Sequence, residues 1–334
     1  MERQNVTEEQ KADYQYYEAS GTPYEIGRIT AQKGGSLLGI EGQLSAEQRK
    51  FAEQCRDIVQ RIYPEMMEEF AGYAAALQLE ENDLLWHYTL GVEGGCSGIA
   101  VQLPEGIVVA RNYDFYYFEN RRHLIYTRPD RGYAHIGMHE GLIGGRFDGL
   151  NEKGLYVSFN GAGQHPDPAV PGISFHLIVR YLLEKCADAK EAKEFLLSVP
   201  VKEAKSYFVV DQTEAFVAEV HPENRAIREM QNGLLVVTNH FVHPAMSAYQ
   251  KQWANSVARY QTLETFGEKI RSNHSDWFDT LQDAMKDHAA PVCGHVDGLA
   301  TFWSCIANTK TGDVFYSFGP VQESIQAIFS LWRL

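Results

Sequence analysis

The sequence predicts an α+β protein in which two mainly antiparallel β-sheets pack together and are covered by helices. Apolar residues recur at helical spacing in the N-terminal part, whereas short strand-like runs joined by Gly, Asn and Asp turns follow from Cys96. The later helical segments separate groups of strands rather than single strands. The regular βαβ alternation of a doubly wound parallel sheet is therefore missing.

The N-terminal part is predicted to be mostly helical. A turn at 21–27 leads into a short helix with Pro23 near its first position. Residues 45–79 follow as a long helical pattern, which Pro64 is expected to kink or split. Residues 1–15 are polar and are expected to be frayed.

The rest of the chain is predicted to contain groups of strands separated by helices. Strands are expected at 98–103, 106–111, 123–128, 133–138, 142–148, 154–160, 206–211, 214–220, 233–238, 298–308 and 313–318. Helices are expected at 175–197, 255–266 and 275–287. No internal repeat, low-complexity tract or linker divides the sequence, so we expect a single domain over residues 1–334.

The composition excludes several classes of partner. With 30 Lys and Arg against 44 Asp and Glu, the net charge of −14 repels the phosphate backbone of nucleic acids. No stretch approaches the roughly 18 apolar residues of a membrane span, and the polar N-terminus lacks the apolar core of a signal peptide. We expect a cytoplasmic homo-oligomer that acts on a small molecule and binds neither nucleic acid nor membrane. The five cysteines are odd in number and widely spaced, which favours free thiols (55, 96, 186, 293 and 305).

Cys96 is the first candidate for chemistry. It follows two glycines at the start of an apolar run, and the turn at 103–106 predicts a β-hairpin with the next run. That hairpin brings Arg111 and Asp114 back beside the thiol, where a cation stabilises thiolate and a carboxylate orients an amine. Taken singly, a cysteine on an apolar segment is more often inert, and the two charges could form an ordinary ion pair.

The glycines before Cys96 suggest a reason for the long segment that precedes it. Gly95 leaves the backbone free to adopt the distorted geometry in which a thiol attacks the preceding carbonyl. An N→S acyl shift followed by hydrolysis would cleave the Gly95–Cys96 bond. The new α-amine of Cys96 could then act as general base for its own thiol. Residues 1–95 would be a propeptide or separate subunit, and residues 96–334 the catalytic part.

Other polar residues at strand ends are weaker candidates. Asn239 ends an apolar strand and could donate to an oxyanion, although turn chemistry is the commoner use of Asn. Asn160 ends a strand in the same way, and Arg259 could anchor this network or lie on a solvated helix face. His240 and His243 lack further ligands at metal-binding spacing. No nucleotide-binding or phosphate-binding motif is present, so we expect neither a metal nor a cofactor.

Together these segments resemble the N-terminal-nucleophile (Ntn) hydrolases, and among them the acyl-coenzyme A:6-aminopenicillanic acid acyltransferase family. The choloylglycine hydrolase and penicillin V acylase branch is more distantly similar. The resemblance covers most of the chain and rests on six segments in the family's order: GTPYEIG at 21–27, Gly95-Cys96, RNYDF at 111–115, GLNEKGL at 149–155, TNH at 238–240 and Gly319-Pro320.

The resemblance implies a four-layer αββα sandwich and autocatalytic cleavage before Cys96. It also implies that Cys96 is the nucleophile, that Asp114 lies near its amine and Arg111 beside its thiol, and that Asn239 belongs to the oxyanion hole. Arg259 corresponds loosely to a late arginine of the choloylglycine branch. Residues 301–305 lack an arginine found there in some acyltransferases, which disfavours coenzyme A-dependent acylation of a β-lactam.

We therefore expect an amidohydrolase that cleaves a linear, non-peptide C–N amide of an acylated amine through a Cys96 thioester. The main alternative is an acyltransferase in which a second amine replaces water. A further alternative is a catalytically silent αββα protein that binds amides.

Overall fold

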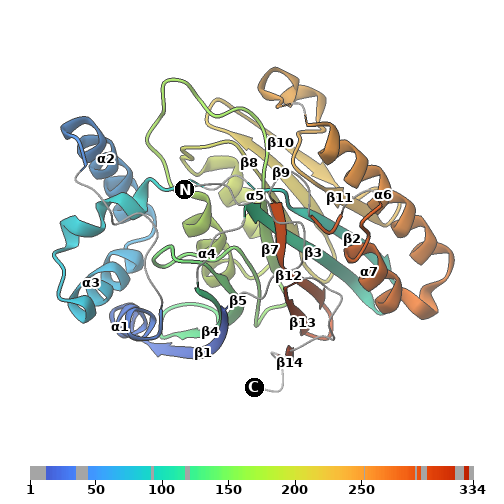
Figure 1. Cartoon of the computed structure of the whole chain (residues 1–334), viewed down its shortest axis with the longest axis horizontal. Coiled ribbons are helices and arrows are strands. Elements are labelled where there is room, and N and C mark those ends of the chain that lie inside the picture. Colours follow the sequence, from blue (N-terminus) through green and yellow to red (C-terminus); the bar gives the residue numbers. More distant parts are fainter. Residues whose placement is uncertain are drawn as a thin grey trace.

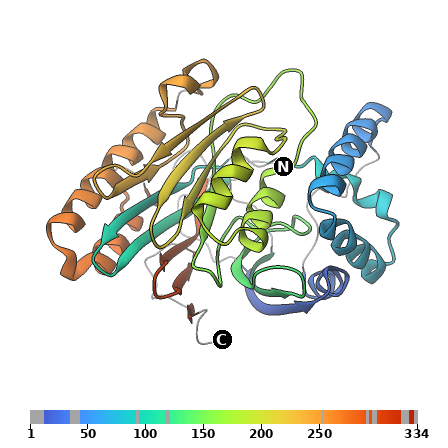
Figure 2. The same ribbon diagram turned by 180° about the vertical axis from the view of Figure 1, so that it is seen from behind.

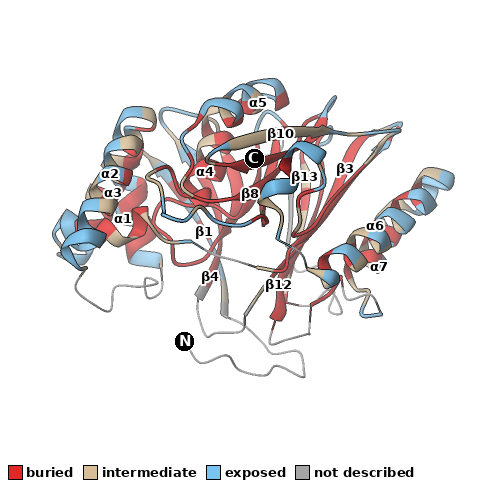
Figure 3. Ribbon diagram, turned by 90° about the horizontal axis from the view of Figure 1, so that it is seen from above, coloured by how far each residue is buried: buried red, intermediate tan, exposed pale blue. Residues whose placement is uncertain are grey.

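Two β-sheets stack face to face between outer layers of helices, which is the αββα arrangement expected from the sequence (Figures 1 and 2). The computed structural model describes residues 13–34, 44–91, 94–116, 121–251, 253–289, 292–294, 299–319 and 327–330. Figure 3 shows buried strands at the centre, with the exposed faces of the helices on the outside. Among the described residues, no helix is long and apolar enough to cross a bilayer.

The first sheet lies on the side of the N-terminal helices. Its strands run in the order β1 (Asp13–Gly21), β4 (Arg121–Pro129), β5 (His135–His139), β6 (Asp148–Asn151), β7 (Tyr156–Gly161), β8 (Lys205–Val210), β9 (Ala215–His221) and β10 (Asn224–Glu229). Neighbouring strands pair antiparallel except β1 and β4, which are parallel. Helices α4 (Phe175–Lys185) and α5 (Ala189–Ser198) pack on its outer face.

The second sheet carries the predicted hairpin. Its strands run in the order β11 (Leu234–Val237), β2 (Ser97–Leu103), β3 (Gly106–Tyr116), β12 (Leu299–Asn308), β13 (Asp313–Phe318) and β14 (Ala327–Ser330), all antiparallel. Helices α6 (Ala254–Ser272) and α7 (Trp277–Met285) cover its outer face. Short 3₁₀ helices, Pro244–Tyr249 and His274–Asp276, flank α6.

The first two helices before Cys96 begin at side chains that cap their N-termini. Thr22 caps α1 (Pro23–Lys33) through a capping box with Glu25, and Ser45 caps α2 (Ala46–Ile62) in the same way. Pro64 separates α2 from α3 (Glu65–Leu77), and a 3₁₀ helix (Glu81–Tyr88) follows. The expected split at Pro64 is therefore confirmed.

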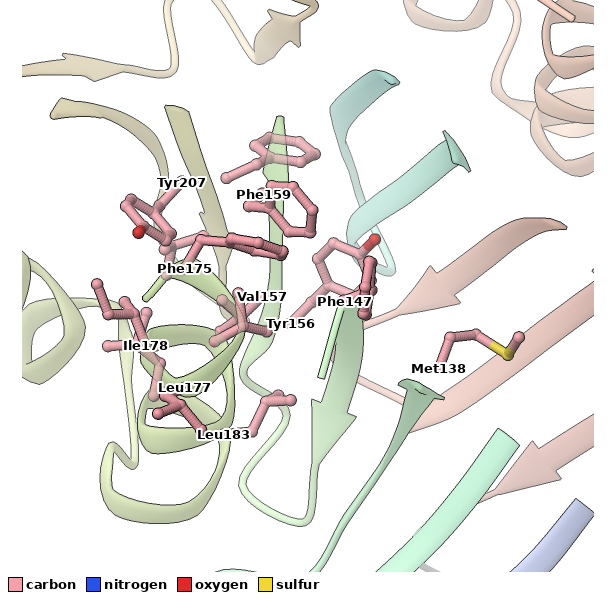
Figure 4. Close-up of a cluster of buried hydrophobic side chains, with 14 of the residues drawn as sticks. Met138, Phe147, Tyr156, Val157, Phe159, Phe175, Leu177, Ile178, Leu183 and Tyr207 are labelled. Atoms are coloured by element: carbon pink, nitrogen blue, oxygen red, sulfur yellow. The ribbon is translucent and has the colours of Figure 1, made fainter. Parts of the chain in front are cut away.

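The segment before Cys96 shares the main hydrophobic core with the segment after it. Side chains of α2 and α3, such as Val59 and Phe70, belong to the same buried cluster as α4 and the facing sheets. Figure 4 shows part of this cluster, in which the Phe159 and Phe175 ring centroids lie 4.1 Å apart. A buried ion pair joins the two segments as well, because Glu69 of α3 lies 3.0 Å from the guanidinium of Arg180 on α4.

Several predicted elements were wrong in detail. Residues 142–147 form turns rather than a strand, because Gly141 and Gly144 adopt positive φ, and β6 begins only at Asp148. The single helix expected at 175–197 is two helices, because Asp188 starts α5 by accepting a hydrogen bond from the Glu191 amide. Strands β1, β10 and β14 were missed. Of the frayed segment expected at 1–15, residues 13–15 belong to β1 and the rest lie outside the described residues.

Candidate active site

The β2–β3 hairpin places Cys96 beside Arg111, as expected. Gly98 pairs with Arg111 and Ser97 with Asn112, and the tight turn closes at Gly106, whose φ is +127°. Cys96 immediately precedes β2 and is fully buried. The Arg111 Nη2 atom lies 3.6 Å from the Cys96 sulfur. The thiol therefore faces a permanent cation.

Arg111 is fixed by a buried carboxylate. Its Nη1 donates to Asp148 Oδ2 at 2.6 Å, and its Nη2 donates to the Phe159 carbonyl at 2.9 Å. The same carboxylate accepts from Trp303 Nε1 at 2.7 Å and from the Tyr316 hydroxyl at 3.1 Å. Burial alone would lower the pKa of Arg111, but its interactions with the Cys96 sulfur and the Asp148 carboxylate raise it above its ordinary value. The guanidinium is thus both charged and immobile.

Burial raises the pKa of the Cys96 thiol, and the Arg111 charge opposes this rise. Asp114 acts in the opposite direction to Arg111, because its negative charge disfavours thiolate. In the continuous chain, the thiol is therefore held protonated by burial. Its activation requires a base close by.

Asp114 borders the Gly95–Cys96 junction. Its backbone carbonyl accepts from the Gly95 amide at 2.9 Å, and its carboxylate accepts from the Thr301 hydroxyl at 2.6 Å. Burial raises the pKa of this carboxyl to about 7, against the opposing effects of Arg259, the Thr301 bond and Arg111. A cationic amine formed beside it would favour its ionised form.

Amide and guanidinium donors hold the backbone carbonyls on each side of Gly95. Asn160 Nδ2 and Arg259 Nη1 donate to the Cys96 carbonyl at 3.0 and 2.8 Å. Asn239 Nδ2 donates to the Gly94 carbonyl at 2.6 Å, and its Oδ1 accepts from Arg259 Nη2 at 2.7 Å. These donors come from β7, from the segment that follows β11 and from α6. Together they fix the backbone around the junction.

Two apolar side chains pack against the junction. A Cβ atom at Gly95 would lie 3.1 Å from Leu299 Cδ1 and 3.3 Å from Trp253 Cη2. The Trp253 ring also lies 5.2 Å from the Arg259 guanidinium carbon. A side chain at position 95 would therefore have to displace Leu299 or Trp253 slightly, so the junction is closely packed.

The structure brings together all of the predicted site residues, which are Gly95, Cys96, Arg111, Asp114, Asn160, Asn239 and Arg259. His240 lies nearby, but its Nδ1 is 2.8 Å from the Ser256 hydroxyl. No group of three or more possible metal ligands occurs among the described residues.

Residues 101–301, more than half of the chain, match the acyl-coenzyme A:6-aminopenicillanic acid acyl-transferase family. The chain belongs to this family. The match extends from β2 to β12. It therefore includes the following site residues: Arg111, Asp114, Asn160, Asn239, Arg259 and Thr301.

One solved structure shares the fold of this member of the acyltransferase family, and two others show a weaker likeness. A mutant conjugated bile acid hydrolase from Clostridium perfringens is similar with a TM-score of 0.52 at 13% identity, over 72% of this chain and 93% of that one. An N-acylethanolamine-hydrolyzing acid amidase ortholog from Caenorhabditis elegans has a TM-score of 0.45 at 14% identity, over 70% of this chain and 99% of that one. Penicillin V acylase from Agrobacterium tumefaciens has a TM-score of 0.45 at 15% identity, over 67% of this chain and 82% of that one.

Sequence reasoning missed three residues at this site. Asp148, which holds Arg111, gave no signal, because it lies 37 residues further along the chain on another sheet. Trp253 gave no signal either. Thr301 lay in a segment noted only for lacking an arginine, although it bonds Asp114 directly.

Proposed function

We propose that this protein is an Ntn amidohydrolase that cleaves a linear, non-peptide C–N amide through a Cys96 thioester, after autocatalytic cleavage between Gly95 and Cys96. The observation that carries the proposal is the arrangement around that peptide bond. A buried thiol, a fixed guanidinium and a carboxyl of raised pKa surround it, and side-chain donors hold the carbonyls of Gly94 and Cys96.

The cleavage begins with attack of the Cys96 sulfur on the Gly95 carbonyl carbon. A carbon–sulfur bond forms, the Gly95–Cys96 C–N bond breaks, and the thiol proton ends on the departing nitrogen. Water then hydrolyses the thioester, which leaves a carboxylate on Gly95 and restores the thiol. Residues 96–334 now begin with the free α-amine of Cys96. The close packing around Gly95 supports this step because it restricts the motion of the reacting groups.

In the turnover reaction, the α-amine of Cys96 takes the proton of its own thiol. The thiolate attacks the substrate carbonyl, and the α-ammonium returns the proton to the leaving amine. The resulting thioester is hydrolysed by water. Arg111 stabilises the thiolate, and the Asp114 carboxylate orients the α-ammonium.

Asn239 is the proposed oxyanion donor. In the continuous chain its amide nitrogen donates to Gly94 O and Gly161 O, so both of its protons are engaged. Departure of the new Gly95 carboxyl terminus would free one of them for the oxyanion of the substrate. Arg259 holds the other end of the Asn239 amide and thereby fixes the direction of its donors.

Acyl transfer is the second candidate, and membership of the acyltransferase family favours it. The two activities share the thioester and differ only in the group that attacks it. Supplying a competing amine, such as 6-aminopenicillanic acid, distinguishes them, because transfer yields a new amide whereas hydrolysis yields the free acid.

The test uses the full chain, its Cys96→Ala variant and a Cys305→Ala control that removes another buried thiol. Each is incubated with penicillin V, conjugated bile salts and N-acyl amino acids, and the products are identified by mass spectrometry. We expect the wild-type and control chains to be cleaved before Cys96 and to hydrolyse at least one amide. Intact wild-type chain without turnover would contradict the proposed function.

A further inference from the structure

Strand β12 contains an irregularity next to the site. Thr301 pairs with Asp114 and Trp303 pairs with Tyr113, so two positions separated by Phe302 face consecutive residues of β3. Side chains alternate between the faces of a sheet, so in a regular strand Thr301 and Trp303, two residues apart, would lie on the same face. The bulge at Phe302 therefore directs Trp303 inward onto Tyr113, with ring centroids 4.0 Å apart, and Thr301 outward onto Asp114.

The Thr301 hydroxyl has a fixed direction. It accepts from the Gly294 amide at 2.8 Å and donates to Asp114 Oδ1 at 2.6 Å. A second bond joins the Thr301 amide to the Gly294 carbonyl at 3.2 Å. Thr301 is 2% exposed, so water does not compete for its hydroxyl. The hydroxyl proton is therefore available to the Asp114 carboxylate.

Gly294 confines the other oxygen of the same carboxylate. A Cβ at position 294 would lie 3.0 Å from Asp114 Oδ2 and 3.1 Å from its Cγ. The charged and titratable groups that face Asp114 are Arg259 from α6, Arg111 from its own strand and the Cys96 thiol before β2. Of the described groups around the carboxylate, Thr301 is the neutral donor that bonds it at hydrogen-bond distance.

The bulge is anchored by the segment before Cys96. The Phe302 carbonyl accepts from the Tyr14 hydroxyl of β1 and from the Gly319 amide, the latter at 2.8 Å. The Arg122 guanidinium lies 3.5 Å from the centroid of the Phe302 ring. The position of Thr301 is therefore set by contacts that reach both sheets.

We propose that Thr301 is a positioning residue, whose hydroxyl aims the Asp114 carboxylate at the α-amine of Cys96 and favours its ionised form. The inference rests on the proposed Ntn function. Thr301 acts through Asp114 and does not itself touch the reacting atoms. The bulge at Phe302 is the backbone feature that makes this contact possible.

Thr301→Val removes the hydroxyl at nearly constant shape, and Thr301→Ser retains it as the matched control. A hydrogen bond to a carboxylate favours its ionised form, so its loss raises the pKa of Asp114. In Thr301→Val, we expect the acid limb of the pH profile of kcat/KM to shift to higher pH by about one to two pH units. We also expect kcat to fall with little change in KM, whereas Thr301→Ser follows the wild type.

A second measurement does not depend on turnover. In the uncut Cys96→Ala chain, the Asp114 carboxyl is titrated by ¹³C NMR, with its signal assigned by loss in Asp114→Asn. Thr301→Val should raise its pKa by the same amount, and Thr301→Ser should not. Circular dichroism establishes that both variants are folded.

The outcomes separate the two proposals. Suppose that the wild-type protein is active, but that Thr301→Val changes neither the NMR titration of Asp114 nor the pH profile of kcat/KM. This result overturns the role of Thr301 and leaves the proposed function standing. A wild-type chain that neither cleaves itself nor turns over any amide overturns the proposed function, and the role of Thr301 with it, even if the NMR titration moves.

Discussion

Replacing Asp114 with Asn should make the uncut chain more stable at neutral pH, although the same substitution in the wild-type chain should remove activity. Burial raises the pKa of this carboxyl to about 7, roughly three units above its ordinary value. The native state therefore holds a proton between about pH 4 and 7 that the unfolded state has released. Stability falls as pH rises through that window, because ionising the buried carboxyl costs free energy.

The magnitude follows from about 1.4 kcal/mol per pH unit. A shift of roughly three units corresponds to about 4 kcal/mol of stability lost between pH 4 and pH 8. Asn is neutral at every pH and removes this dependence. The increase in the free energy of unfolding caused by Asp114→Asn should therefore grow with pH and level off above the raised pKa of Asp114.

Urea unfolding at several pH values measures the effect. The parent chain carries Cys96→Ala, which prevents the proposed cleavage and leaves in place Arg259, Thr301 and Arg111, the groups that oppose the rise in the Asp114 pKa. Asp279→Asn, which removes an exposed carboxyl from α7, is the matched control. A pH-independent difference for Asp114→Asn would refute the reasoning, because the Asp114 carboxyl would then titrate as if it were hydrated.

Three further predictions concern the cleaved protein. On a denaturing gel, wild-type protein should separate into two pieces, residues 1–95 and 96–334. In size-exclusion chromatography under native conditions the two pieces should elute together, because they share one hydrophobic core. Two separate peaks would contradict this prediction. Asn239→Ala should lower turnover about 10²–10³-fold if its amide is an oxyanion donor, and an unchanged rate would remove it from the site. Limiting iodoacetamide should label Cys96 of the cleaved protein before the other four thiols, as read by peptide mass spectrometry; earlier labelling of Cys305 would count against the nucleophile.

The site shows which features a single sequence could predict. Arg111 and Asp114 were predictable because a short hairpin fixes their positions relative to Cys96, and the turn that closes the hairpin is visible in the sequence. Asn160 and Asn239 were predictable only as polar residues at strand ends. Their convergence on the carbonyls around Gly95 depends on how distant strands are ordered in both sheets.

The two misassigned elements, the strand expected at 142–148 and the missed strand β1, have different causes. The strand expected at 142–148 has suitable apolar residues, but its glycines adopt positive φ and turn the chain. Strand β1 is the edge partner of β4 although the two are far apart in sequence, and no local pattern specifies such a parallel pairing. Local backbone conformation therefore decided the first case, and tertiary pairing decided the second.

By itself, the sequence determined the succession of helical and strand-rich segments, the hairpin that follows Cys96 and the helix starts near Pro23 and Ser45. These depend on interactions between residues close in the chain. Only the tertiary structure decided that Asp148 holds Arg111 and that a bulge at Phe302 directs Thr301 onto Asp114. The physical reason is that the face on which a strand residue lies depends on register, and register is fixed by packing between strands far apart in sequence.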